Sequence, residues 1–124
     1  MTSRRRWRVR LTVAAEADVR DIALWTANCF GAAQARAYAA TLSGAIRELA
    51  EGPAVPGARR REDIAKGIMA LHVVRGGRKG RHVVVYRVGA PAKPPVIDVL
   101  RVLHEAMDLS RHVGETKDED SNHA

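Results

Sequence analysis

The sequence has little of what holds many small proteins together. It contains one cysteine, Cys29, and only five aromatic residues among its 124 positions. A single cysteine excludes a disulfide within the chain and fits a reducing compartment. No apolar run is long enough to span a bilayer, and Arg8 and Arg10 interrupt the segment that would have to be apolar in a signal peptide. We therefore expect a cytoplasmic protein of one domain, large enough to bury a core without disulfides or metals.

Acidic residues are also scarce. Lys and Arg total 21 against 14 Asp and Glu, so the formal net charge is +7. Residues 113–124 hold four acidic residues and one Lys, which leaves about +10 on residues 1–112. Seventeen of the basic residues are Arg, whose planar fork of donors suits phosphates and carboxylates. The charge indicates an anionic partner, either a nucleic acid or an acidic protein, although a solvated basic surface has the same composition.

Residue types that bind metals and nucleotides lack the spacing that such sites need. The five His residues and Cys29 show no metal-ligand pattern. The glycines of segment 76–80 do not lead from a strand into a helix, so they indicate a hairpin turn rather than a phosphate-binding loop. Cys29 ends an apolar stripe and is expected in the core. We predict no metal and no cofactor.

The first third of the chain predicts one strand and two helices. Apolar residues alternate with Arg8 and Arg10 over residues 7–13, the period of a half-buried strand that ends with Val13. A helix is predicted over 14–29, with Thr12 as its N-cap and Gly31 closing it. Its apolar face is formed by Ala15, Val19, Ile22, Trp25 and Cys29. A second helix is predicted over 32–50, with an apolar stripe formed by Ala35, Tyr38, Ala39, Leu42, Ile46 and Leu49.

The rest of the chain predicts a sheet. Residues 53–63 are expected to form a loop that carries Arg59, Arg60 and Arg61, and strands are predicted over 68–74, 82–88 and 96–103. Tyr86 lies inside a strand and is expected to pack in the core. One or two helical turns are expected over 105–112, and the tail 113–124 is expected to be disordered. The order β-α-α-β-β-β predicts an α+β domain over 1–112, with a helical hairpin on a small, mostly antiparallel sheet and a short C-terminal helical turn.

Several short segments, taken in this order, resemble a known family. The segments are Ala14-Ala15-Glu16-Ala17-Asp18-Val19-Arg20-Asp21-Ile22, Gly31-Ala32-Ala33-Gln34-Ala35, Leu71-His72-Val73, His82-Val83-Val84-Val85-Tyr86-Arg87-Val88 and Arg101-Val102-Leu103-His104-Glu105-Ala106-Met107-Asp108. Together they resemble the ParE toxins of the RelE/ParE superfamily over residues 8–112. The resemblance implies a toxin of a type II toxin–antitoxin system that inhibits DNA gyrase by binding it. It also implies a ParD-like antitoxin as the second partner.

The RelE branch of the superfamily instead cleaves mRNA on the ribosome, which leaves an enzymatic alternative. Such cleavage needs a proton acceptor, a proton donor and cations around the phosphate. If the protein is a ribonuclease, His104, Arg101 and Arg81 are the candidate catalytic residues. No Tyr follows Tyr86, no Lys-rich segment with aromatic neighbours offers a platform for bases, and a lone His at a strand end is more often structural. We therefore predict no catalytic residue; an inactive homologue that only binds its antitoxin is the third alternative.

Two binding surfaces are predicted. The segment from Arg101 to His112 is expected to project beyond the sheet, and the residues predicted to bind the target are Arg101, His104, Met107 and Leu109. Arg8 and Arg10 lie on the strand face opposite the core and are predicted to pair with carboxylates of the antitoxin. A solvated strand face is the alternative for the second surface.

Overall fold

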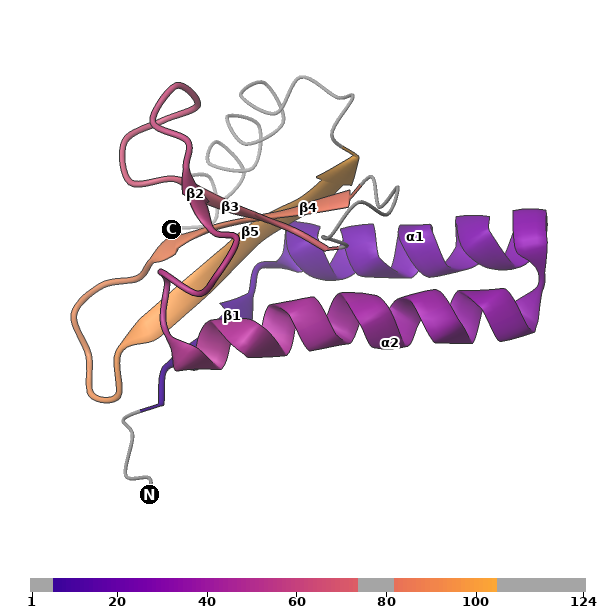
Figure 1. Ribbon diagram of the computed structural model, residues 1–124, viewed down its shortest axis with the longest axis horizontal. Coiled ribbons are helices and arrows are strands. Elements are labelled where there is room, and N and C mark those ends of the chain that lie inside the picture. Colours follow the sequence, from indigo (N-terminus) through magenta and orange to yellow (C-terminus); the bar gives the residue numbers. More distant parts are fainter. Residues whose placement is uncertain (1–5, 74–81, 105–124) are drawn as a thin grey trace.

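The computed structural model describes residues 6–73 and 82–104 and confirms the predicted α+β architecture (Figure 1). The elements are β1 (Arg8–Leu11), α1 (Val13–Phe30), α2 (Ala32–Glu48), a 3-10 turn η1 (Leu49–Glu51), β2 (Arg59–Arg60), β3 (Met69–His72), β4 (His82–Val88) and β5 (Val96–His104). The five strands form one sheet in the order β1-β5-β4-β3-β2. β1 runs parallel to β5, and the other neighbours are antiparallel.

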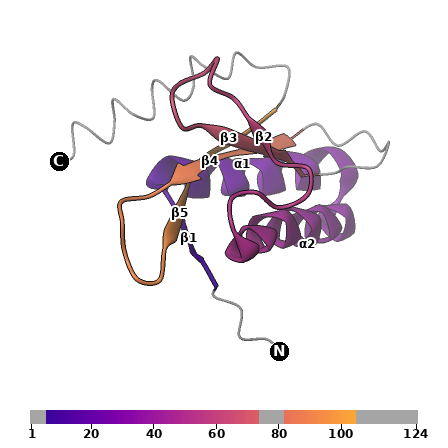
Figure 2. The same cartoon turned by 60° about the vertical axis from the view of Figure 1, so that its left-hand side comes forward.

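The two helices form a hairpin that lies on one side of the sheet (Figures 1 and 2). Thr12 is the N-cap of α1, as predicted: its hydroxyl oxygen accepts the backbone N–H of Ala15 at 3.1 Å. Gly31 joins the helices with a positive φ of 94°, a conformation that residues with a Cβ rarely adopt. The many small residues of α2 allow the two helices to pack closely. Together they form the helical layer of the domain, with Gly31 as the turn between them.

The core fills both faces of the sheet. On the helix side, Leu42 of α2 and Leu49 of η1 pack with Tyr86, Ile97 and other buried strand residues. On the opposite side, a smaller cluster is covered by Ile64 and Ala65, and its buried members are Ile68, Ala70, Val83, Val85 and Leu100. Tyr86 is fully buried, as predicted, and its hydroxyl donates to the Pro53 carbonyl at 2.6 Å. Burial raises the pKa of Tyr86 to about 12.

Two local expectations differ from the structure. Arg59 and Arg60, expected in a loop, form β2, which pairs with Ala70 and Met69 of β3. Arg59 and Arg60 are both exposed and show no alternation of apolar and polar residues that would predict a strand. Their pairing depends instead on the open edge of β3. Val13, expected on the buried face of the first strand, is the first residue of α1 and is 80 % exposed.

The far end of the hairpin corrects a third expectation. Trp25 is 59 % exposed and Cys29 is also exposed, although both were predicted in the core. Figure 1 shows the reason, because α1 and α2 extend well past the ends of the strands. Trp25 instead makes an edge-on contact with Phe30, with ring centroids 5.8 Å apart. The apolar stripe of α1 is therefore longer than the sheet beneath it.

The predicted Gly-rich loop, the C-terminal helical turn and the acidic tail lie outside the described residues.

Candidate functional site

Arg101 does not project beyond the sheet but is held against α1. Its Nε donates to Asp18 Oδ2 at 2.8 Å, and its Nη2 donates to Asp18 Oδ1 at 2.9 Å. The two side chains are only 17 % and 11 % exposed. This bidentate geometry is the strongest form of Arg–carboxylate pairing, and it occupies the fork that a phosphate would need. The expected placement of Arg101 is therefore corrected, whereas its predicted role in target binding remains a prediction.

β5 is irregular beside Arg101. The register shifts between Val85 and Tyr86 of β4, so that Leu100 is an extra residue in β5. Side chains at the start of α1 bind the backbone groups of β5 on both sides of Arg101. Thr12 donates its hydroxyl to the Leu100 carbonyl at 2.8 Å, and Asp18 Oδ2 also accepts the backbone N–H of Val102 at 2.9 Å. We call Thr12, Asp18, Leu100, Arg101 and Val102 the α1–β5 clasp.

His104, the last residue of β5, belongs to a cluster with two residues that the sequence did not single out. It lies opposite His82 in the β4–β5 register, and the two rings meet edge to face with centroids 5.7 Å apart. The hydroxyl of Tyr38, from α2, is hydrogen-bonded to His82 Nδ1 at 2.8 Å. The structure thus brings together Tyr38, His82 and His104, which we call the Tyr–His–His cluster.

Burial determines the protonation behaviour of Tyr38 and His82. Desolvation, and secondarily the charge of His104, lowers the pKa of His82, so the neutral imidazole is favoured. Desolvation also raises the pKa of Tyr38 and keeps its hydroxyl protonated. Two imidazoles in edge-to-face contact are residue types that can serve as proton acceptor and donor, which is the chemistry that the ribonuclease alternative requires.

Sequence reasoning missed Tyr38 and His82 for different reasons. Tyr38 fits the apolar stripe of the second helix, where its hydroxyl gives no signal of its own. His82 starts a strand, and pairing 82–88 with 96–103 as a hairpin would have placed it near His104. The other candidates, Arg81, Met107 and Leu109, lie outside the described residues.

The outer edge of β1 carries the second predicted surface. Arg8 and Arg10 are exposed on the face opposite the core, as predicted, while Val9 and Leu11 face inward. Arg10 donates its Nε to Asp98 of β5 at 3.0 Å, so its charge is shared within the sheet. Within residues 6–73 and 82–104, the Arg8 side chain takes part in no hydrogen bond or salt bridge.

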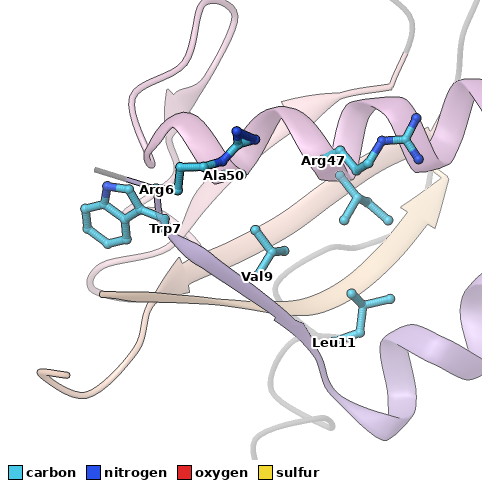
Figure 3. A pocket seen from close by; sticks show the side chains of 7 residues that line it. Arg6, Trp7, Val9, Leu11, Arg47 and Ala50 are labelled. Atoms are coloured by element: carbon cyan, nitrogen blue, oxygen red, sulfur yellow. The ribbon is translucent and has the colours of Figure 1, made fainter. Parts of the chain in front are cut away.

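A groove opens beside this edge, between β1 and the C-terminal end of α2. Its volume is about 280 Å³, and it is lined by Arg6, Trp7, Val9, Leu11, Ile46, Arg47 and Ala50. Figure 3 shows Val9 and Leu11 rising from β1 toward α2, with Arg6 and Arg47 beside them. The floor is apolar and two guanidinium groups border it. The sequence predicts a basic, apolar groove between the helical hairpin and the sheet, but its position beside β1 depends on how a helix crosses a strand, which no local pattern indicates.

Within residues 6–73 and 82–104, no three His, Cys, Asp or Glu side chains are grouped so that they could hold a metal ion. No helix of this part of the chain is long and apolar enough to cross a membrane.

Comparison with known proteins agrees with the fold and defines the class. The family model described as the ParE toxin of the type II toxin–antitoxin system parDE matches residues 9–109. Toxin ParE1 of Caulobacter vibrioides is 33 % identical over 105 residues, which cover 85 % of this chain and 96 % of the relative. Toxin ParE of Escherichia coli is 37 % identical over 101 residues, which cover 80 % and 85 %.

A solved structure shares the fold. It comes from the chromosomal ParDE toxin–antitoxin system of P. aeruginosa, has a TM-score of 0.64 at 18 % identity, and the match covers 79 % of this chain and 95 % of that one. The family model and the two toxin relatives show that the protein is a toxin of the type II toxin–antitoxin class. Within that class, the chain belongs to the ParE family.

Proposed function

We propose that this toxin acts in the cytoplasm by binding DNA gyrase, that a ParD-like antitoxin neutralises it, and that it is not an enzyme. Membership of the ParE family supports the partners. The observation that carries the non-enzymatic part is the Arg101–Asp18 pair, with Nε–Oδ2 at 2.8 Å. A guanidinium whose Nε and Nη2 both donate to one carboxylate is a poor ligand for a substrate phosphate, because that bidentate pair would have to break before the same edge could bind it.

A gyrase assay tests this proposal. Purified chain is added to DNA gyrase and relaxed plasmid, and supercoiling is measured against the same reaction with the co-purified toxin–antitoxin complex. Free toxin is expected to block supercoiling, and the complex is expected to leave it intact. Full supercoiling with an excess of free, folded toxin would contradict gyrase as the target.

The Tyr–His–His cluster favours a second candidate function, a ribosome-dependent endoribonuclease. Its test is a cell-free translation reaction in which mRNA ends are mapped with wild-type chain and with His104→Ala. Cleavage that the substitution abolishes would replace the binding proposal. If expression without antitoxin left growth unchanged, both gyrase inhibition and mRNA cleavage would be contradicted. An inactive homologue that only binds its antitoxin would then be favoured.

A further inference from the structure

Three large apolar side chains are exposed at the far end of the α1–α2 hairpin. Leu24 and Phe30 are each 64 % exposed, and Trp25 is 59 % exposed. Figure 1 shows that this end of the hairpin lies beyond the ends of the labelled strands. The space around Gly31 is open, since a Cβ at this position would meet no atom within 4 Å apart from its chain neighbours. We call residues 24–34 the hairpin tip.

The hairpin tip lies within a stretch of sequence that carries no charge. Residues 22–35 contain no Asp, Glu, Lys or Arg, although these four types make up 28 % of the chain. A nucleic acid or an acidic protein would need cations at its contact surface, and this segment supplies none. The buried cores of protein–protein interfaces, in contrast, are depleted of charge and enriched in aromatic residues. The tip therefore fits an apolar surface of another protein.

The exposed aromatic side chains of the tip are already packed against each other. The rings of Trp25 and Phe30 meet edge to face, at 71° and with centroids 5.8 Å apart. Thr26, next to Trp25 in sequence, is buried, and its hydroxyl donates to the Ile22 carbonyl at 2.7 Å. The small Thr26 thus takes the inward position at this level of α1, and the two rings lie outside. A preformed pair of rings loses little side-chain freedom on binding, which favours affinity.

The shape and size of the tip indicate what kind of partner covers it. The tip is a convex end of two helices (Figure 1). Its three large apolar side chains offer roughly 100–150 Å² each, whereas a stable dimer needs about 800 Å² from each partner. Two convex ends that met head-on would bury still less, so a second copy of this chain fits poorly. A recess in a larger protein encloses such an end, and aromatic anchors in recesses carry much of the binding energy at interfaces.

We propose that the hairpin tip inserts into an apolar recess of the target, DNA gyrase, with Trp25 as its anchor and Leu24 and Phe30 beside it. This inference rests on the proposed function, since it names the surface by which the toxin holds its target. The α1–β5 clasp fixes the base of α1 to the sheet, so the hairpin carries the tip as a rigid arm. The tip shares no residue with the segment from Arg101 to His112, which the sequence predicts to bind the target, so the two assignments are tested separately.

A matched pair of charge substitutions tests the tip. Leu24→Glu places a carboxylate in the tip, whereas Val13→Glu makes a change of the same kind at the other end of α1, where Val13 is also exposed. Because both positions are exposed, both variants are expected to fold like wild type, which circular dichroism verifies. The toxin concentration that half-inhibits gyrase supercoiling is expected to rise by about thirtyfold or more for Leu24→Glu and to stay unchanged for Val13→Glu.

Trp25→Ala removes the anchor without adding a charge. It is expected to raise the half-inhibiting concentration by a similar factor, while the affinity for the antitoxin, measured by calorimetry, stays at the wild-type value. An equal loss of antitoxin affinity would assign the tip to the antitoxin and overturn the inference. Sedimentation of the free wild-type chain is expected to show a monomer. A dimer that Leu24→Glu dissociates would assign the tip to a second copy and would also overturn the inference.

The supercoiling assay separates this inference from the proposed function. Inhibition by the wild-type chain, with the same half-inhibiting concentration for Leu24→Glu and Trp25→Ala, would overturn the tip as the contact surface and leave gyrase as the target. Absence of inhibition by the folded wild-type chain would overturn the proposed function, and this inference with it.

Discussion

Two Arg–Asp pairs join β5 to its neighbours. Their chemistry is the same, but they differ in exposure and in the number of hydrogen bonds around them. Arg101 and Asp18 are 17 % and 11 % exposed, and the carboxylate also binds a backbone N–H. Arg10 and Asp98 are 60 % and 19 % exposed, at the edge of the sheet. A largely buried pair with several hydrogen bonds stabilises the fold, whereas an exposed pair contributes little and can be exchanged for another partner. The comparison teaches which basic residues remain available for recognition.

Removing the carboxylate of the clasp has the largest expected effect. Asp18→Ala leaves the buried Arg101 guanidinium without its carboxylate and the Val102 N–H without its acceptor. We expect the free energy of unfolding, measured by urea denaturation at pH 7, to fall by about 3 kcal/mol. A loss below about 1 kcal/mol would contradict the structural role of the pair, since that is the range of exposed pairs.

Thr12→Ala is expected to cost less, because it removes two neutral hydrogen bonds. The hydroxyl caps α1 through Ala15 and also binds the Leu100 carbonyl. We expect a loss of about 1–2 kcal/mol in the same assay. Thr41→Ala is the matched control, because the Thr41 hydroxyl bonds only to the Ala37 carbonyl on an exposed helix face; its effect is expected within about 0.5 kcal/mol. Equal losses for both variants would contradict the clasp.

The Tyr–His–His cluster predicts a smaller, pH-dependent effect. The pKa of His82 is lowered in the folded state from its ordinary value of 6.5, so the unfolded chain binds the proton more strongly. The stabilisation from neutral His82 is therefore complete above this value and is lost as the pH falls below it. His82→Gln is expected to flatten the unfolding free energy between pH 7 and pH 5 relative to wild type. Parallel profiles for the two proteins would show that His82 does not titrate differently on folding.

The exposed pair has the smallest expected effect. Arg10→Ala is expected to change the free energy of unfolding by less than about 1 kcal/mol, and added salt should reduce the difference further. Urea denaturation at low and high salt measures both. A loss as large as that for Asp18→Ala would remove the distinction between the two pairs.

Local patterns predict the elements of this fold well, and tertiary contacts account for what they miss. The N-cap Thr12, the glycine between the helices and the strand over 82–88 each follow from residues close in sequence. Trp25 was misplaced because helical periodicity carries no information on where the sheet ends. The partner of Arg101 is 83 residues away, so no local pattern indicates it. The same holds for the Tyr–His–His cluster and the β1 groove, which form only where separate elements meet.

The most direct test of the account is whether the toxin inhibits gyrase or instead cleaves mRNA in a way that depends on His104. Purified wild-type chain and His104→Ala are compared in the supercoiling assay and, in parallel, in the ribosome-dependent mRNA cleavage assay. The account predicts that the wild-type chain blocks supercoiling and leaves mRNA intact, since inhibition by binding needs no proton transfer from an imidazole. Unimpaired supercoiling together with mRNA cleavage that His104→Ala abolishes would contradict it.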